Sequence, residues 1–98
     1  MNFNQKVYKI TKKIPKGKVA TYKQIAKHIN SKAYRAVGNA LNKNKNPRVP
    51  CHRVIKSNLE VGGFNKGTKQ KIKLLKKEDI KIINNKISKK HLFLKKNI

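Results

Sequence analysis

The N-terminal half of this chain holds three short helical patterns separated by stop signals, and this alternation limits the possible folds more than any other feature. In the first pattern, apolar residues recur three or four positions apart, at Phe3, Val7, Ile10 and Ile14. This spacing predicts a helix with one apolar face and lysines elsewhere. Pro15-Lys16-Gly17 predicts its end, because proline and glycine both interrupt helices.

The second and third patterns lie close together in the sequence. Thr21 and Gln24 make a capping-box pattern, which predicts a helix over residues 22–29. After a polar break, Ser31 is the expected N-cap of a further helix over residues 32–43. Two short helices that meet at a tight break have the layout of a helix-turn-helix, whose second helix meets nucleic acid.

The C-terminal half carries weaker signals. Val54-Ile55 predicts the start of a short buried strand. Thr68 is the expected cap of a helix over residues 69–77, with Ile72 and Leu75 facing the core. A turn at Asn84-Asn85 between apolar pairs predicts a small hairpin.

Together these elements predict a mainly α protein with short strands, arranged as a winged-helix-like domain that carries the helix-turn-helix. At 98 residues we expect one domain over 1–98, with residues 88–98 as a basic and partly mobile tail. No apolar run approaches the roughly 20 residues of a membrane span, and the N-terminus has no signal-peptide core. We therefore expect a cytoplasmic protein without a membrane partner.

The charge balance indicates the class of partner. Lysine and arginine number 27 against three acids, a formal net charge of +24. Such a domain is expected to bind a polyanion, DNA or RNA above all. An AT-rich genome would explain lysine in place of arginine but not the shortage of acids. The three acids, Glu60, Glu78 and Asp79, are therefore candidates for a specific role. On charge alone, a basic ribosomal or chromatin-type protein is the alternative class.

Cys51 is the single cysteine, and His52 follows it directly. One cysteine allows no intramolecular disulfide and no cysteine-based zinc site. Pro47 and Pro50 withhold two N–H groups, which predicts an irregular, held loop over residues 49–51. Most single cysteines are inert apolar residues, but a nearby cation lowers a thiol pKa from about 8.5 toward reactivity. Both interpretations remain open on the residues alone.

A cysteine beside a histidine allows three kinds of chemistry. Hydrolysis by a thiol nucleophile normally needs a third group that orients the histidine. Redox exchange usually needs a second, resolving cysteine, which this chain lacks. Direct transfer of a group from a substrate to sulfur suits a DNA-binding scaffold, because the substrate would be an electrophilic group on a base.

Several segments carry a family resemblance, in this order along the chain: Arg35-Ala36-Val37-Gly38-Asn39-Ala40, Asn44, Pro50-Cys51-His52-Arg53-Val54-Ile55, Gly62-Gly63-Phe64, and Leu74-Leu75 leading to Glu78. In these segments the chain resembles the C-terminal catalytic domain of the O6-alkylguanine-DNA alkyltransferases. The resemblance covers nearly the whole chain, from about residue 3 to residue 87. Its most specific part is the Pro-Cys-His-Arg-Val core with Arg-Ala-Val-Gly upstream.

The resemblance implies direct-reversal DNA repair by a methylated-DNA–protein-cysteine methyltransferase. Cys51 would take an alkyl group, typically methyl, from O6 of a flipped guanine and keep it as a thioether, so each molecule would act once and without a cofactor or metal. His52 would accept the thiol proton through a water, and Glu78 would orient the His52 ring. Tyr22 would donate a hydrogen bond to the departing base. The simpler alternatives are a helix-end charge for Glu78 and ordinary packing for Tyr22.

By the same resemblance, Arg35 would enter the base stack of double-stranded DNA through the minor groove, and small neighbours would allow close approach. The residues expected on this DNA-binding face are Ala33, Tyr34, Arg35, Ala36 and Gly38. A phosphate contact is the simpler alternative for Arg35. Asn44 matches the family's hinge asparagine, but Asn42 and Asn46 compete for that role. We expect the protein to act as a monomer.

The base pocket implied by the resemblance comprises Val54, Gly62, Gly63, Phe64 and Asn65, with backbone N–H groups around Asn65 holding O6. Family members commonly have a tyrosine and a serine where this chain has Phe64 and Asn65, so the range of accepted alkyl groups is open. Relatives that bind without transfer have another residue in place of the cysteine, and Cys51 therefore favours transfer. The alternatives are a non-catalytic module that senses alkylated DNA and a basic RNA- or ribosome-associated protein.

Overall fold

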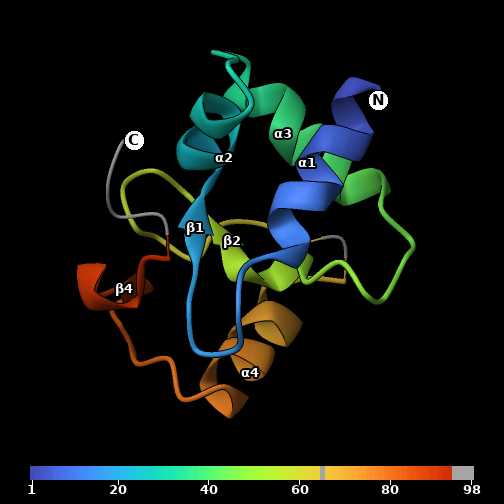
Figure 1. The fold of residues 1–98 in the computed structure, drawn as a ribbon. Coiled ribbons are helices and arrows are strands. Elements are labelled where there is room, and N and C mark those ends of the chain that lie inside the picture. The colour runs from blue at the N-terminus through green and yellow to red at the C-terminus, as the bar shows by residue number, and fades with distance from the viewer. Residues whose placement is uncertain (65, 94–98) are drawn as a thin grey trace.

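The fold places three helices at one end of the molecule and a fourth helix at the other (Figure 1). A computed structural model describes residues 1–64 and 66–93. Helices α1 (Phe3–Lys12), α2 (Tyr22–His28) and α3 (Tyr34–Lys43) pack together, and α4 (Thr68–Lys77) lies apart from them. Between the two ends, strands β1 (Ala20–Thr21) and β2 (Val54–Ile55) pair in parallel, with Ala20 opposite Val54.

The first helix forms as its apolar spacing predicts. Asn2 and Gln5 close a capping box at its N-terminus, and Val7 and Ile10 are buried on its inner face. Ile14 lies beyond the helix end and is still buried, and Phe3 is partly buried against the same cluster, so the predicted apolar face is confirmed.

The helix-turn-helix is confirmed, but α3 begins later than predicted. Thr21 and Gln24 make the expected capping box for α2. The predicted N-cap role of Ser31 is wrong, because its hydroxyl accepts the N–H of Ala33 at 3.0 Å and closes the turn between the helices. A serine hydroxyl satisfies a turn N–H as readily as a helix end. Ala33 is the residue at the N-cap, without a side-chain hydrogen bond.

The segment around Cys51 is more regular than predicted. Cys51–Arg53 forms one turn of 3₁₀ helix, labelled η1, in which the N–H of Arg53 donates to the carbonyl of Pro50 at 2.9 Å. The irregular loop therefore ends at Pro50, and a proline is suited to the position before a helical turn because its missing N–H is not needed there.

The C-terminal half has the predicted helix and hairpin. Gly67, with a φ of 95°, precedes α4 as its N-cap, so the predicted cap at Thr68 is wrong by one residue. Strands β3 (Ile82–Ile83) and β4 (Lys86–Ile87) pair in antiparallel fashion. The two asparagines of the turn between them both have positive φ, as a two-residue hairpin turn requires.

The described part of the basic tail is attached to the domain. Lys89–His91 forms a short 3₁₀ helix, η2, and the residues after it run alongside Val19. The N–H of Val19 donates to the carbonyl of His91 at 2.8 Å, and the N–H of Phe93 donates to the carbonyl of Val19 at 2.8 Å. Residues 94–98 lie outside the described residues.

Two apolar clusters form the core. The first joins α1, α2 and α3 to Val49, Cys51 and Val54, and the second joins β2 to α4 and the hairpin through Val61, Leu75 and their neighbours. Within the described residues, no helix is both long and apolar enough to cross a membrane.

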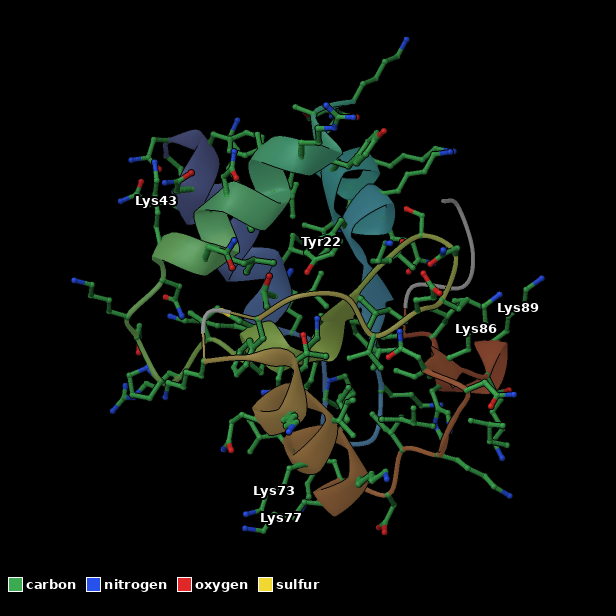
Figure 2. The ribbon with its side chains drawn as sticks, turned by 180° about the vertical axis from the view of Figure 1, so that it is seen from behind. Tyr22, Lys43, Lys73, Lys77, Lys86 and Lys89 are labelled. Carbon is green, nitrogen blue, oxygen red and sulfur yellow. The ribbon has the colours of Figure 1, made fainter. Side chains whose placement is uncertain are left out.

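The positive charge is spread over the surface and is not confined to α3. Lysine side chains point outward in different directions, among them Lys43 at the end of α3, Lys73 and Lys77 on α4, and Lys86 and Lys89 near the hairpin (Figure 2). A polyanion could therefore approach more than one face of the molecule.

Candidate active site

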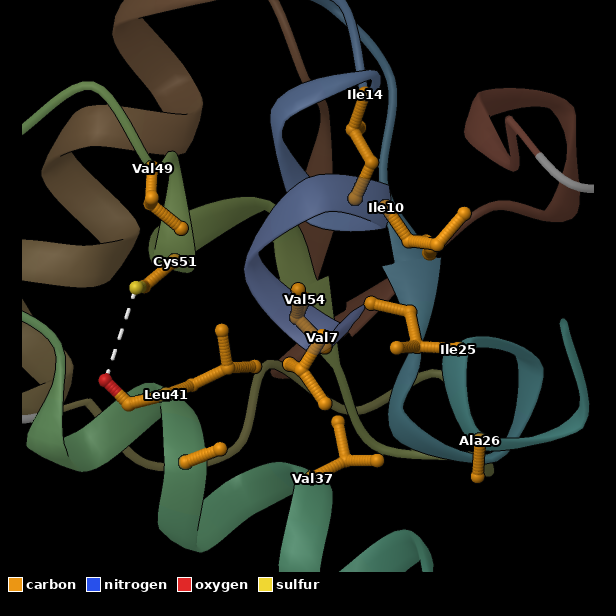
Figure 3. Packing of buried hydrophobic residues seen from close by; sticks show 12 residues of the cluster. Val7, Ile10, Ile14, Ile25, Ala26, Val37, Leu41, Val49, Cys51 and Val54 are labelled. Carbon is orange, nitrogen blue, oxygen red and sulfur yellow. Dashed lines mark hydrogen bonds between the residues drawn. The ribbon is translucent and has the colours of Figure 1, made fainter. Parts of the chain in front are cut away.

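Cys51 lies at the start of η1 with its thiol directed at the C-terminal end of α3 (Figure 3). The side-chain amide of Asn44 donates to Sγ at 3.2 Å, and the thiol lies 3.7 Å from the carbonyl oxygen of Leu41. Cys51 belongs to the first apolar cluster and is 9% exposed. The two contacts hold the sulfur in one orientation between the helix end and the pocket described below.

Asn44 is the asparagine that contacts the thiol. Its Nδ2 also donates to the carbonyl of Asn46 at 2.9 Å, and its Oδ1 accepts the N–H of Asn46 at 3.2 Å. Asn46 uses its own side chain to accept the N–H of Arg48 at 3.0 Å, and Asn42 is exposed on α3. Of the three asparagines that the sequence left open, Asn44 therefore couples the end of α3 to Cys51.

The predicted pairing of His52 with Glu78 is present. His52 Nε2 lies 2.9 Å from Glu78 Oε2, across 26 residues of sequence. Sequence reasoning missed the third member, Arg53, which donates from Nε to Oε1 at 2.9 Å and from Nη2 to Oε2 at 2.7 Å. Arg53 Nη1 also donates to the carbonyl of Ile14 at 2.8 Å. The planar guanidinium group of Arg53 matches the geometry of a carboxylate. The sequence signal that could have revealed Arg53 was its place beside His52 in the motif.

The protonation states in this cluster follow from burial and pairing. Burial alone would raise the pKa of Glu78, but hydrogen bonds from Arg53 and His52 outweigh it and hold the pKa below its ordinary value. Burial lowers the pKa of His52, and the Glu78 carboxylate offsets only part of that effect. His52 is therefore neutral at neutral pH. With its Nε2–H donating to Glu78, its Nδ1 is the nitrogen that can accept a proton.

The thiol itself is not strongly acidic. Burial raises the pKa of Cys51, while the hydrogen bond from Asn44 and the charge of Lys71 lower it by less. Cys51 is thus mostly protonated at neutral pH and needs a base for rapid reaction.

Lys71 is a buried residue that the sequence analysis did not predict. It is 0% exposed, and its Nζ donates to the carbonyls of Val54 at 2.6 Å and Gly63 at 3.0 Å. Burial lowers the pKa of Lys71 to about 8. Sequence analysis placed Ile72 and Leu75 on the inner face of α4. Leu75 is buried, and its position four residues after Lys71 was the signal that could have revealed the lysine.

The glycine-rich segment connects Lys71 with Tyr22. The Tyr22 hydroxyl lies 3.5 Å from the Gly63 carbonyl, and Lys71 Nζ lies 5.7 Å from the centre of the Tyr22 ring. Gly62 has a φ of 77°, a conformation that side chains rarely adopt. Phe64 is partly buried and packs against the cluster that contains Cys51.

Two of the predicted pocket residues need comment. The Val54 side chain is fully buried in the core, so Val54 can offer a base only its backbone, and its carbonyl already accepts from Lys71. Asn65 lies outside the described residues.

A pocket of about 410 Å³ opens beside the thiol. Its wall includes Cys51, His52 and Phe64, and basic side chains stand around it: Lys12, Lys45, Arg48, Arg53 and Lys66. A cavity of this volume can accommodate a small aromatic ligand, and its positive rim suits a ligand attached to phosphates.

The predicted DNA-facing residues lie at the start of α3, on the surface. Ala33, Tyr34 and Arg35 are exposed, and Tyr34 is 47% exposed although it is aromatic. Ala36 and Gly38 are half-buried. A Cβ at Gly38 would meet the Tyr22 ring at 3.9 Å, an ordinary contact, so packing within the protein does not require glycine there.

Comparison with known proteins gives the family. Residues 2–80 match the DNA-binding domain of 6-O-methylguanine DNA methyltransferase. The chain belongs to this family. It is 49% identical over 81 residues to the methylated-DNA–protein-cysteine methyltransferase of Saccharolobus solfataricus, a match that covers 82% of this chain and 52% of the relative. The chain thus spans about half the length of the curated relatives it matches.

Solved structures of family members confirm the predicted fold class. The Mycobacterium tuberculosis protein OGT in complex with DNA is 37% identical with a TM-score of 0.76, over 81% of this chain and 49% of that one. The Schizosaccharomyces pombe protein Atl1, in complex with damaged DNA containing O6-carboxymethylguanine, is 28% identical with a TM-score of 0.82. That match covers 93% of this chain and 94% of Atl1.

Proposed function

We propose that this chain is the catalytic, C-terminal type of domain of an O6-alkylguanine-DNA alkyltransferase and repairs DNA by direct reversal. It transfers an alkyl group from guanine O6 to Cys51 in a single turnover. The observation that carries the proposal is a thiol fixed by Asn44 at a pocket, followed in sequence by a neutral His52 whose Nε2 is bonded to Glu78. That arrangement supplies a nucleophile, a base and a group that orients the base.

In this reaction His52 Nδ1 accepts the thiol proton, through a water, and the Cys51 thiolate attacks the alkyl carbon. The bond between that carbon and guanine O6 breaks, its electron pair goes to O6, and a thioether forms on sulfur. The departing guanine takes a hydrogen bond from the Tyr22 hydroxyl, which lies beside the Gly63 carbonyl. Simple hydrolysis does not reverse a thioether, so each molecule acts once.

The target carbon lies inside duplex DNA, so the nucleotide has to be turned out, at a few kcal/mol. We propose that α3 lies in the minor groove and that Arg35, exposed in its first turn, enters the vacated stack. The exposed Ala33 and the small Ala36 and Gly38 allow the helix to approach closely. The extruded base then reaches Cys51 past Phe64 and the Gly62-Gly63 backbone. A monomer acting in the cytoplasm suffices for this reaction.

The test is a mass measurement on the intact protein. Incubation with duplex DNA that contains O6-methylguanine is expected to add the mass of one methyl group, located on the peptide with Cys51. Cys51→Ala is expected to bind the same DNA and to gain no mass. Reduced wild-type protein that leaves the lesion and its own thiol unchanged would refute transfer.

A second candidate function is lesion recognition without transfer. The observation that favours it is the match to Atl1, whose solved structure is a complex with damaged DNA. That match covers nearly the whole of both chains. A binding module of this kind predicts tight binding to O6-alkylguanine DNA with no change in protein mass. The same mass measurement therefore separates the two functions.

A further inference from the structure

Tyr8 of α1 is a polar side chain that has no part in the reaction described above. Helices α1 and α3 pack against each other (Figure 1), and the Tyr8 hydroxyl donates to the Ala40 carbonyl of α3 at 2.6 Å, across 32 residues of sequence. Burial raises the pKa of Tyr8, and the Cys51 thiolate raises it further, so the hydroxyl is protonated at neutral pH and can donate. This hydrogen bond joins the two helices.

The acceptor of this bond lies in the last turn of α3, where helix carbonyls lack N–H partners within the helix. Ala40 is 1% exposed, and a buried carbonyl without a donor costs free energy. A cavity of about 720 Å³ adjoins this helix end, with Tyr8, Asn44 and Val49 in its wall. Packed side chains therefore support the helix end less on that side, and the Tyr8 hydroxyl fixes the last turn of α3 to α1.

The residues that follow Ala40 hold the thiol. The carbonyl of Leu41 lies 3.7 Å from Cys51 Sγ and also accepts the backbone N–H of Asn44 at 3.2 Å. The Asn44 side chain in turn donates to Sγ at 3.2 Å. Both contacts with the sulfur therefore start from the helix end that Tyr8 fixes, and a shift of that end would move the donor and the acceptor together.

We propose that Tyr8 is a positioning residue for the Cys51 thiol, because its hydroxyl fixes the end of α3 and thereby keeps Asn44 in contact with the sulfur. Without the hydroxyl, water from the cavity has to reach the Ala40 carbonyl, and the last turn of α3 has to move to admit it. Asn44 then donates to the sulfur for a smaller fraction of the time. As a role in alkyl transfer, this inference rests on the proposed function, but its effect on the thiol is a property of the free protein.

The experiment measures the rate at which iodoacetamide alkylates Cys51 near neutral pH, in the absence of DNA. Thiolate sulfur displaces iodide, so the rate below the thiol pKa follows the thiolate fraction. Tyr8→Phe removes the hydroxyl and keeps the ring. Thr11→Val is the matched control, because the buried Thr11 hydroxyl donates to the Val7 carbonyl at 2.7 Å, a bond of similar length that stays within α1.

Burial raises the pKa of Cys51 and the hydrogen bond from Asn44 opposes that rise, so weakening this bond raises the pKa further and slows alkylation. Tyr8→Phe is expected to slow alkylation about twofold to fivefold, the effect of one hydrogen bond. Thr11→Val is expected to react at the wild-type rate, although urea unfolding should show a comparable loss of stability in both variants. A Tyr8→Phe rate equal to or above the wild-type rate would overturn the proposal and leave the hydroxyl a purely structural tie.

A second comparison tests whether Tyr8 acts through Asn44. In Asn44→Ala the donor to the sulfur is absent, so adding Tyr8→Phe is expected to slow alkylation by a smaller factor than in the wild-type background. The same factor in both backgrounds would overturn the proposal, because the hydroxyl would then affect the thiol independently of Asn44. Neither comparison involves alkylated DNA, so failure of methyl transfer with the expected Tyr8 effect would refute the proposed function alone.

Discussion

Replacing Glu78 with glutamine tests the site through both its chemistry and its stability. Glu78 accepts two hydrogen bonds from Arg53 and one from His52. The three side chains are largely buried: Glu78 is 11% exposed, Arg53 17% and His52 14%. Glutamine keeps one oxygen, which can still accept from Arg53 Nε. Its amide nitrogen then faces two other donors. Glu78→Gln therefore loses one charge-assisted hydrogen bond and leaves one donor without an acceptor. We expect these changes to lower the free energy of unfolding by about 2 kcal/mol.

For a domain of this size, that cost lowers the melting temperature by roughly 10 °C. The chemical effect has a separate cause. The glutamine amide can donate to His52 Nε2, which places the ring proton on Nδ1 and leaves no nitrogen to accept the thiol proton. We therefore expect methyl transfer to slow by about 10²–10⁴-fold, the usual contribution of a general base.

The stability effect also has a predictable pH dependence. The pKa of Glu78 is lowered in the folded protein, so the stability it contributes is present above its ordinary pKa and is lost as the pH falls through the folded value. The assay is urea unfolding between about pH 3 and pH 7. The free-energy difference between wild type and Glu78→Gln should be largest near neutral pH and should shrink in acid.

Asp79→Asn is the matched control, because it removes the neighbouring and exposed acid. It should change neither the transfer rate nor the stability by more than about 0.5 kcal/mol. A Glu78→Gln difference that stays constant with pH, or a variant that transfers methyl groups at the wild-type rate, would refute the roles given to Glu78.

Two further predictions concern the thiol and the DNA-binding face. Asn44→Ala removes a donor to Sγ and is expected to raise the pKa of Cys51, to slow iodoacetamide alkylation several-fold near pH 7 and to cost about 1 kcal/mol in urea unfolding, with exposed Asn42→Ala unaffected. An unchanged alkylation rate would contradict the contact with sulfur. Arg35→Ala is expected to reduce methyl transfer from duplex DNA at least tenfold and to leave transfer from free O6-methylguanine nearly unchanged. Equal losses on both substrates would argue against its entry into the base stack.

The sequence predicted most of the elements because their signals are local. The spacing of Val7 and Ile10, the capping box at Thr21 and the asparagine turn of the hairpin each act within a few residues. The predictions at Ser31 and Thr68 were wrong for the same reason, since a hydroxyl residue near a helix start can serve a turn or the first helical position equally well.

What the sequence did not predict depends on long-range contacts. Arg53 lies next to His52 in the chain, but its partner is 25 residues away. Lys71 is one of 27 basic residues, and only its place four residues before the apolar Leu75 indicates that it could face inward. Its burial depends on where α4 meets the carbonyls of Val54 and Gly63, which is a property of the packed domain.

The arrangement of charges in the site suits a reaction that forms anions. In the proposed transfer, both the thiolate and the departing guanine would carry negative charge, and an isolated carboxylate beside them would oppose each. Glu78 can orient His52 without this penalty because Arg53 neutralises it through two hydrogen bonds. Because the charges of Glu78 and Arg53 cancel, the Lys71 ammonium gives the buried part of the site, within the described residues, a net positive charge. In the proposed transfer, one of the three acids therefore fixes the base, and the cations around it would favour each charged step.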